Sequence, residues 1–475
     1  MNKKLRSAAL LYGAAKYSTV FVTLLTASVL ARLISPAEYG IVTVVTVFLS
    51  LFTVLADMGL GNAVIQNKTL TKEEIDGIFS LSVYISVALA LVFAMLGFPI
   101  SVIYGNRVYV KICAMLSAAV FFSTMNIMPS ALLMRDKRFA LVGKRLICIS
   151  VFVGATSILL AYLGMSYYTI VIQQVLQSML TFLWNRVNVT LHFHWRIHLS
   201  GVRKIGNYSI YQVLYYLVNN VARNLDNMLI GKFMGSEPLA HYDKGYRLMM
   251  YPVQNLTMVI NPIVHPILSD HQNDRRYIYD SYMKLAKVLS LAGLFVSAVC
   301  FWGAREIILL FFGSQWESAV PVFCILSLSV WPQMVASSAS SVYQSTGNTR
   351  LMFQSGMVHF SVAIAMIIAG VATGSLETVA KLVALSLYFR FFIDYYILVT
   401  RNFGYSYGAF LKAFLPDVVI AAALALAIAV LSPMVGGLSG LVSLFVKGCL
   451  MLAVFAVGLK ATGQLALLRG ILKRD

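Results

Sequence analysis

Long apolar segments separated by short polar breaks follow one another along the whole chain. A helix rises 1.5 Å per residue, so a segment of about 20 apolar residues crosses a hydrocarbon core of about 30 Å. Breaks that contain Gly, Pro and charged residues mark the ends of such segments. The pattern predicts about fourteen membrane-spanning helices, at residues 9–33, 40–64, 78–104, 110–134, 141–163, 167–191, 207–233, 244–268, 284–312, 320–344, 353–374, 377–400, 416–435 and 438–460.

The amino-acid composition agrees with this pattern. Hydrophobic residues make up 59% of the chain and charged residues only 12%, against roughly 25% charged residues in a soluble domain. The N-terminal segment has the basic flank of a signal peptide, but it contains Lys16 and lacks a convincing cleavage site, so we expect it to remain as the first helix. The sequence therefore predicts an all-α polytopic membrane protein without a soluble domain.

Basic residues gather in alternate loops. With the N-terminus in the cytoplasm, the cytoplasmic segments include "MNKKLR", "RDKRF" and the tail "LLRGILKRD", whereas "SPAEY", "GMSYY" and "GSQWES" on the opposite side contain no Lys or Arg. Because cytoplasmic loops collect Lys and Arg, we expect both chain ends to lie in the cytoplasm. This bias, with attraction to anionic lipids, explains much of the net charge of +19 without nucleic-acid binding.

The first and seventh predicted spans are related by an offset of 200 positions. The offset pairs "LARLIS", Leu30 to Ser35, with "IGKFMG", Ile230 to Gly235. Both spans start from the cytoplasm, so the repeat is parallel, as in transporters built from two lobes. We predict six-helix lobes at residues 1–200 and 201–402 around a central cavity, followed by two C-terminal helices and a basic tail at 403–475.

The seventh span carries a polar stripe. At about 100° per residue its polar side chains share one side of the helix, and they are Tyr208, Gln212, Tyr215, Asn219, Arg223 and Asp226. The first span has a similar, less polar stripe, formed by Tyr12, Lys16, Thr19, Thr23 and Thr26. Helices with one polar and one apolar side are typical of the wall of a hydrated cavity inside a membrane protein.

Several ionisable residues lie inside or at the ends of predicted spans, where each charge costs about 2.5 to 3.5 kcal/mol at the bilayer centre. They are Lys16, Asp57, Arg223, Asp226, Arg247, His265, Arg390 and Asp394. Each faces a cavity or has a structural role. The pairs Arg223 with Asp226 and Arg390 with Asp394 have the spacing of intrahelical ion pairs, and Lys16 can instead snorkel to the interface.

The other three have alternatives of the same kind. Arg247 lies close to the outer surface, where anchoring competes with a role in binding. Asp57, within "LADMGLGNAVIQ", either ends a helix beside close-packed glycines or faces the cavity. His265, between Pro262 and Pro266, is either a satisfied polar group in a broken helix or a proton carrier.

Motifs of enzymes and ATP-driven pumps are missing from the sequence. It contains no G-x-x-x-x-G-K-[ST], H-E-x-x-H or G-x-S-x-G motif and no cluster of Cys and His. We therefore expect no catalytic residue, no metal ligand and no cofactor. An integral membrane enzyme is therefore disfavoured.

Several segments, in order along nearly the whole chain, resemble the polysaccharide exporters of the Wzx type. They are "VLARLISPAEYGIVTVVTVF", "LADMGLGNAVIQ", "DNMLIGKFMGSEPLAHYDKGYRLMMYPVQNLTMVINPIVHPILS", "LFFGSQWESAVPVFCILSLS" and "STGNTR". These exporters belong to the multidrug/oligosaccharidyl-lipid/polysaccharide superfamily. The likeness is greatest to the branch that handles colanic-acid-type exopolysaccharide or capsule.

The resemblance implies a flippase of the bacterial inner membrane that moves undecaprenyl-pyrophosphate-linked oligosaccharides by alternating access, with a polysaccharide polymerase and a chain-length regulator as further partners. A charged, hydroxylated head group needs cationic and hydrogen-bonding residues along its path, for which the candidates are Lys16, Tyr208, Tyr215, Asn219, Asn220, Arg223, Arg247 and Arg390. The candidates for coupling or gating are Asp57, Asp226, His265 and Asp394. A multidrug cation antiporter and a lipid II flippase remain alternatives.

Overall fold

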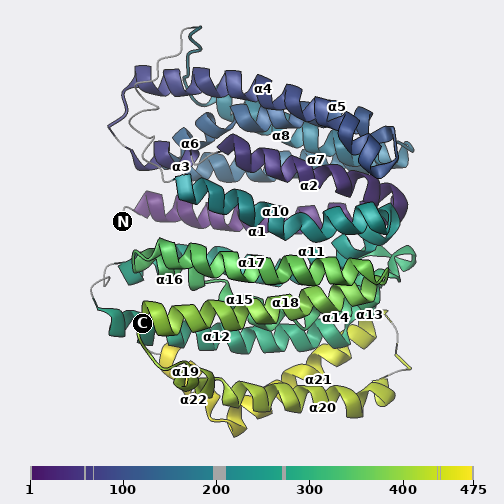
Figure 1. Cartoon of the computed structure of the whole chain (residues 1–475), viewed down its shortest axis with the longest axis vertical. Coiled ribbons are helices and arrows are strands. Elements are labelled where there is room, and N and C mark those ends of the chain that lie inside the picture. Colours follow the sequence, from purple (N-terminus) through teal and green to yellow (C-terminus); the bar gives the residue numbers. More distant parts are fainter. Residues whose placement is uncertain are drawn as a thin grey trace. The chain divides into compact units, whose positions relative to one another are not determined.

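The computed structural model describes residues 3–57, 60–67, 69–195, 210–269, 274–435, 437–438 and 440–472. Within these ranges every regular element is a helix, as the sequence predicted (Figure 1). By their internal contacts the helices divide into two compact units, unit 1 (Met1–Ala240) and unit 2 (His241–Asp475). The predicted lobe limits at residues 200 and 402 stay predictions.

Unit 1 contains the helices up to α10 and the start of α11. They are α1 (Lys3–Leu33), α2 (Pro36–Asp57), α3 (Leu60–Gln66), α4 (Lys72–Tyr104), α5 (Val108–Met125), α6 (Ile127–Arg135), α7 (Phe139–Tyr162), α8 (Tyr168–Val187), α10 (Ile210–Phe233) and the first residues of α11 (Ser236–Ser269).

Unit 2 contains the rest of α11 and the helices that follow. They are α12 (Arg275–Trp302), α13 (Ala304–Phe312), η1 (Ser314–Trp316), α14 (Ala319–Ser327), α15 (Val330–Ala336), α16 (Ala339–Ser345), α17 (Thr349–Ala372), α18 (Leu376–Tyr396), the π-helix η2 (Ile397–Asn402), α19 (Tyr407–Ala413), α20 (Leu415–Val435), α21 (Gly440–Ala461) and α22 (Gln464–Leu472).

Each predicted span coincides with one helix or with consecutive helices. Among the described residues, ten helical segments are long and apolar enough to cross a membrane. An eleventh span is added if Ala319–Ser327 and Val330–Ser345, which meet at a bend of 48°, count as one. The chain is therefore a multi-pass helical membrane protein, and the number fourteen stays a prediction.

The offset of 200 positions reappears in the helix ends. α1 ends at Leu33 and α10 at Phe233, while α2 begins at Pro36 and α11 at Ser236. Both connections consist of two residues, and the first residue of each continues the hydrogen-bond pattern of the preceding helix. The Ile34 amide donates to the Leu30 carbonyl at 2.9 Å, and the Met234 amide donates to the Ile230 carbonyl at 2.8 Å. The two helical hairpins thus turn at equivalent positions.

Local sequence signals fix several helix starts. Thr71 and Glu74 form a capping box at the start of α4, in which the Glu74 amide donates to the Thr71 hydroxyl at 3.3 Å and the Thr71 amide to the Glu74 carboxylate at 3.0 Å. Ser35 and Glu38 bond in the same way at the start of α2. These bonds satisfy amides that a helix start leaves without a partner.

Glycines let helices of unit 1 approach closely. A Cβ on Gly97 of α4 would lie 2.9 Å from the Val110 Cα of α5, and one on Gly154 of α7 would lie 2.6 Å from the Thr26 Oγ1 of α1. Small residues at such crossings are typical of membrane helices, because helix association there depends on close packing.

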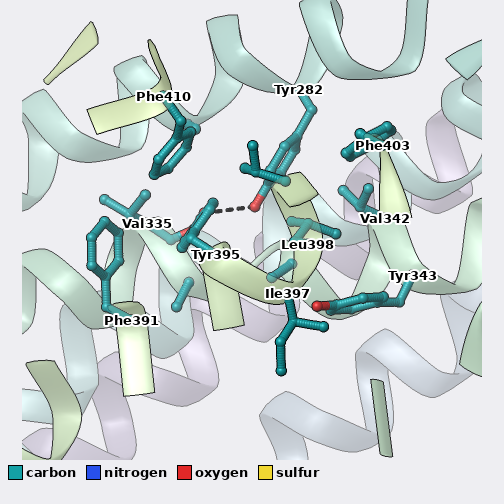
Figure 2. Packing of buried hydrophobic residues seen from close by; sticks show 14 of the residues in the cluster. Tyr282, Val335, Val342, Tyr343, Phe391, Tyr395, Ile397, Leu398, Phe403 and Phe410 are labelled. Carbon is teal, nitrogen blue, oxygen red and sulfur yellow. Dashed lines mark hydrogen bonds between the residues drawn. The ribbon is translucent and has the colours of Figure 1, made fainter. Parts of the chain in front are cut away.

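An aromatic cluster forms a core in unit 2. Figure 2 shows Tyr282 of α12 and Tyr395 of α18 surrounded by apolar side chains, with their hydroxyl groups 2.7 Å apart. The Tyr395 hydroxyl also lies 2.9 Å from the Val335 carbonyl oxygen, to which it donates. Buried hydroxyls that find partners in this way avoid the cost of an unsatisfied polar group.

Candidate functional site

The polar stripe of α10 lies at the end of unit 1. Asn219 and Asn220 are half-buried, and the Asn220 side-chain oxygen accepts a hydrogen bond of 3.2 Å from the Ser50 hydroxyl of α2. The Asn224 amide donates to the Asn220 backbone carbonyl at 2.8 Å. The side of α10 next to the stripe is thus fixed against α2 through Asn220.

Arg223 and Asp226 differ in their surroundings. Arg223 is exposed, and among the described residues its guanidinium has no hydrogen bond or ion pair. Asp226 is buried, with 4% of its surface exposed, and its carboxylate accepts a hydrogen bond of 2.8 Å from the backbone amide of Asn227. The intrahelical ion pair allowed by their spacing is therefore not formed, and the Arg223 guanidinium is available to an anion.

The other predicted residues of unit 1 are less informative. Lys16 is half-buried on α1. Asp57 is the last residue of α2, and the Gly61 amide donates to its carboxylate, so it takes part in the helix end. Tyr208 lies outside the described residues, as does the side chain of Tyr215 and, in unit 2, that of His265.

Arg247 of α11 forms an ion pair within its own helix. Its Nε lies 2.7 Å from Asp243 Oδ2, and the arginine side chain is 60% exposed while the aspartate is 7% exposed. Between them, Lys244 is buried with its ammonium 5.0 Å from the Phe312 ring centre and 5.2 Å from that of Trp316. The sequence did not point to Asp243 and Lys244, because their span was judged from its prolines and its outer arginine.

Asp394 of α18 is the centre of a buried polar cluster. Its carboxylate accepts from the Ser355 hydroxyl of α17, while Arg390 Nε lies 3.4 Å from Oδ2 and His359 Nδ1 lies 3.6 Å from Oδ1. The Tyr343 hydroxyl donates to the Asp394 backbone carbonyl at 3.1 Å. The intrahelical pair predicted for Arg390 exists, but it is only one contact of a larger cluster.

Two further buried cations were missed by sequence reasoning. Arg145 of α7 donates to the Asn185 side-chain oxygen at 2.8 Å, and the Asn185 amide donates to the Asn126 side-chain oxygen at 2.7 Å. Lys287 of α12 pairs with Asp417 of α20. Both cations lie one or two turns inside a predicted span, where spacing alone does not separate a buried partner from snorkelling to the interface.

The polar side chains of the described residues form no metal centre. In the part of the chain that the structure describes, no three His, Cys, Asp or Glu side chains come together in a way that could hold a metal ion. The polar groups there are instead the exposed Arg223 guanidinium, several ion pairs, and amide and hydroxyl groups. Such groups can bind anions and polyols without forming covalent bonds.

Comparison with known proteins gives a family match. The model of a family described as polysaccharide biosynthesis protein matches residues 29–321. The chain is 23% identical over 373 residues to the teichuronic acid biosynthesis protein TuaB of Bacillus subtilis (strain 168), covering 76% of each chain. It is 21% identical over 392 residues to the lipopolysaccharide biosynthesis protein WzxC of Escherichia coli (strain K12), covering 81% of this chain and 78% of the other.

Solved structures show the same fold. The lipid II flippase MurJ in its inward closed conformation matches with a TM-score of 0.75 at 13% identity, over 94% of this chain and 98% of that one. An inward-facing multidrug resistance transporter of the MATE family matches with a TM-score of 0.61 at 15% identity, over 86% and 95% of the two chains. These two solved structures are those of a flippase and a transporter.

Proposed function

The chain belongs to the polysaccharide biosynthesis protein family, and on this premise we propose that it is a flippase for lipid-linked oligosaccharides. It moves undecaprenyl-pyrophosphate-linked repeat units from the cytoplasmic to the periplasmic leaflet of the bacterial inner membrane, for the synthesis of exopolysaccharide, capsule or O-antigen. The relatives named for teichuronic acid and lipopolysaccharide biosynthesis support a polysaccharide cargo. The flippase-like fold supports transport as the step performed.

The observation that carries the proposal is the exposed guanidinium of Arg223. A pyrophosphate loses its hydration when it enters the membrane, so it needs a cation that holds it there. Arg223 is exposed and makes no ion pair among the described residues, whereas Arg247 and Arg390 each contact a carboxylate of their own helix. Arginine binds phosphate oxygens through two parallel hydrogen bonds, which suits this role.

The remaining candidates have supporting roles in this proposal. Lys16, Arg247 and Arg390 add positive charge along the path, and Asn219 and Asn220 hydrogen-bond to the head group, together with Tyr208 and Tyr215. The lipid tail stays in the bilayer. Both chain ends lie in the cytoplasm, as the distribution of basic residues favours, and the two lobes rock in turn to expose the cargo on each side.

Energy comes from an H⁺ or Na⁺ gradient in this scheme, or from consumption of the product by a polymerase. Asp57, Asp226, His265 and Asp394 are the candidates for coupling. We favour Asp394, because it is buried and lies near both a histidine and an arginine. Ion binding at a group of this kind can change its contacts on two helices, α17 and α18, at once.

The test is complementation of a bacterium that makes the native repeat unit but lacks its own flippase. We expect wild type to restore surface polymer, and Arg223→Ala at the same membrane level to leave lipid-linked repeat units inside the cell. Arg305→Ala is the matched control, because Arg305 is 66% exposed and pairs only with the exposed Glu317 among the described residues. Full activity of Arg223→Ala would remove the central residue of the scheme.

The alternatives predict other results. A lipid II flippase would support growth of cells depleted of their own lipid II flippase, and a multidrug antiporter would raise resistance to cationic drugs. Drug antiport favours carboxylates that face the cargo, whereas in this chain the exposed ionisable group of the α10 stripe is Arg223 and the aspartate of that stripe, Asp226, is buried. Restoration of surface polymer without either of those effects would support the polysaccharide cargo.

A further inference from the structure

Unit 1 contains a polar cavity that none of the candidate binding and coupling residues lines. Its volume is about 390 Å³, and it lies among α1, α2, α5, α7 and α8. Cavities of roughly 300 to 1,000 Å³ are typical of sites for small ligands. The side chains in its wall all come from unit 1, and some of them, such as Gln177, are exposed.

The wall is polar but uncharged. Ten of its fourteen residues are Thr, Ser or Gln, and none is ionisable. A charge without a partner is costly to bury, so a cavity of this kind disfavours both a phosphate and a cation as its main occupant. It is also poorly suited to an apolar ligand, because that ligand would cover ten polar side chains without replacing their hydrogen bonds to water.

Five of the seven hydroxyl groups in the wall already donate to a backbone carbonyl of their own helix. Thr19 donates to the Ala15 carbonyl at 2.9 Å, Thr53 to the Leu49 carbonyl at 2.9 Å and Ser150 to the Ile147 carbonyl at 3.0 Å. Each bond lies within one helix, so the hydroxyl oxygen is left as an acceptor towards the cavity. These residues can accept hydrogen bonds from a ligand, but they can donate only by breaking a bond to their own helix.

Apart from Thr23 and Thr26, whose hydroxyls make no hydrogen bond among the described residues, the free donors come from three glutamines on α8. Gln173, Gln174 and Gln177 line the cavity, and their side-chain amides have no hydrogen-bond partner among the described residues. Each amide offers two N–H donors and one carbonyl acceptor. The wall therefore combines many acceptors with a small set of unpaired donors, which matches a ligand whose groups each donate and accept.

Gly154 explains how the cavity keeps its shape. Its missing side chain lets α7 contact α1 at Thr26, and a second glycine of α7, Gly143, packs against Ala15 so closely that a Cβ on Gly143 would lie 3.3 Å from the alanine Cβ. The threonine stripe of α1 is thereby turned towards Gln174 and Gln177. The stripe was visible in the sequence, but the glutamines of α8 were not connected with it.

We propose that this cavity is a binding site for an uncharged sugar residue of the cargo. The inference rests on the proposed function, since it assigns one part of the lipid-linked oligosaccharide to one site. Sugar hydroxyls donate to the acceptors of the wall and accept from the glutamine amides, and no charge is needed. The pyrophosphate and any acidic sugar bind elsewhere, at cationic residues such as Arg223.

Binding is tested with the full-length protein in lipid nanodiscs. The polymer made from the native repeat unit is hydrolysed to give two probes, its neutral oligosaccharides and its acidic oligosaccharides. The third probe is Na⁺ alone. Saturation-transfer NMR measures sugar binding, and a thermal shift measures Na⁺ binding. The variant Gln174→Leu/Gln177→Leu removes two amides at similar side-chain volume, and Gln344→Leu changes an exposed glutamine of unit 2 as the matched control.

We expect wild type and Gln344→Leu to bind the neutral oligosaccharides, and the double variant to bind them about tenfold more weakly, because two neutral hydrogen bonds are lost. Equal binding by all three proteins, binding of acidic sugars only, or a response to Na⁺ alone that the double variant loses would each overturn the proposal. If the double variant does not reach the membrane, Gln177→Leu provides the same comparison at an exposed position.

Complementation separates this inference from the proposed function. If wild type fails to restore surface polymer but binds neutral oligosaccharides through Gln174 and Gln177, the proposed function is wrong and the sugar site stands. If wild type restores the polymer and the double variant binds sugar and exports as well as wild type, the sugar site is wrong and the proposed function stands.

Discussion

The buried pair of Lys287 and Asp417 allows a quantitative test of what holds α20 and α22 against α12 within unit 2. Lys287 is 9% exposed and Asp417 is 1% exposed at their side chains. The Lys287 ammonium also donates to the Ala413 carbonyl at 2.7 Å, and the Gln464 amide of α22 donates to the Asp417 carboxylate at 2.7 Å. Ser290 completes the set as a third donor to this carboxylate.

The perturbation is Asp417→Leu, which leaves the lysine ammonium buried with one carbonyl and the Phe414 ring, 5.1 Å away, as partners. Removal of one partner of a buried ion pair costs about 3 to 5 kcal/mol. Gln464 and Ser290 lose their acceptor as well, so we expect the upper part of this range. For a unit of this size, the loss corresponds to a fall in melting temperature on the order of 10 °C.

The double variant Lys287→Met/Asp417→Leu removes both charges. Replacement of a buried ion pair by apolar residues of similar volume is often neutral or stabilising, so we expect it to melt within a few degrees of wild type. The assay is thermal unfolding of purified protein in detergent, combined as a double-mutant cycle with the single variant Lys287→Met. A single Asp417→Leu variant as stable as wild type, or a double variant as unstable as Asp417→Leu, would refute the reasoning.

Two further predictions concern packing and coupling. A Cβ on Gly40 would lie 1.8 Å from the Ser236 carbonyl oxygen, whereas a Cβ on Gly13 would have no atom within 4 Å. We therefore expect Gly40→Ala to lower the amount of folded protein severalfold, measured by fluorescence-detected gel filtration. Gly13→Ala is the control, which we expect to be neutral or slightly stabilising. Asp394→Asn keeps the size of the side chain but removes its charge, so we expect transport into vesicles to stop responding to an imposed H⁺ or Na⁺ gradient. The control Asp243→Asn should keep this response. An unchanged response in Asp394→Asn would exclude Asp394 as the coupling group.

The sequence predicted the helices well because each carries its own signal. Apolar length and polar breaks are local features, and the predicted spans that end at residues 33 and 233 match the ends of α1 and α10. The breaks between α12 and α13, α14 and α15, and α15 and α16 were not predicted, because each lies inside a segment whose overall hydropathy is that of one span. A hydropathy pattern does not show where a helix bends inside an apolar run.

Partners across helices were harder to predict than the residues themselves. Asp394 and Arg390 were found from their spacing, since a pair four residues apart shares one side of a helix. His359 is 35 residues from Asp394 and was missed, as was Lys287, which is 130 residues from Asp417. Contacts of this kind depend on which helices pack together, and no pattern within one helix contains that information.

The buried polar groups of the two units differ in chemistry. In unit 2 the carboxylates of Asp394 and Asp417 contact cations. Such pairs satisfy one another, so they have little hydrogen-bonding capacity left for a ligand. In unit 1 the cavity wall is neutral, and the amides of Gln174 and Gln177 are unpaired among the described residues. We therefore expect variants in the unit 1 cavity to change recognition of the cargo, and variants of the unit 2 pairs to change stability or coupling.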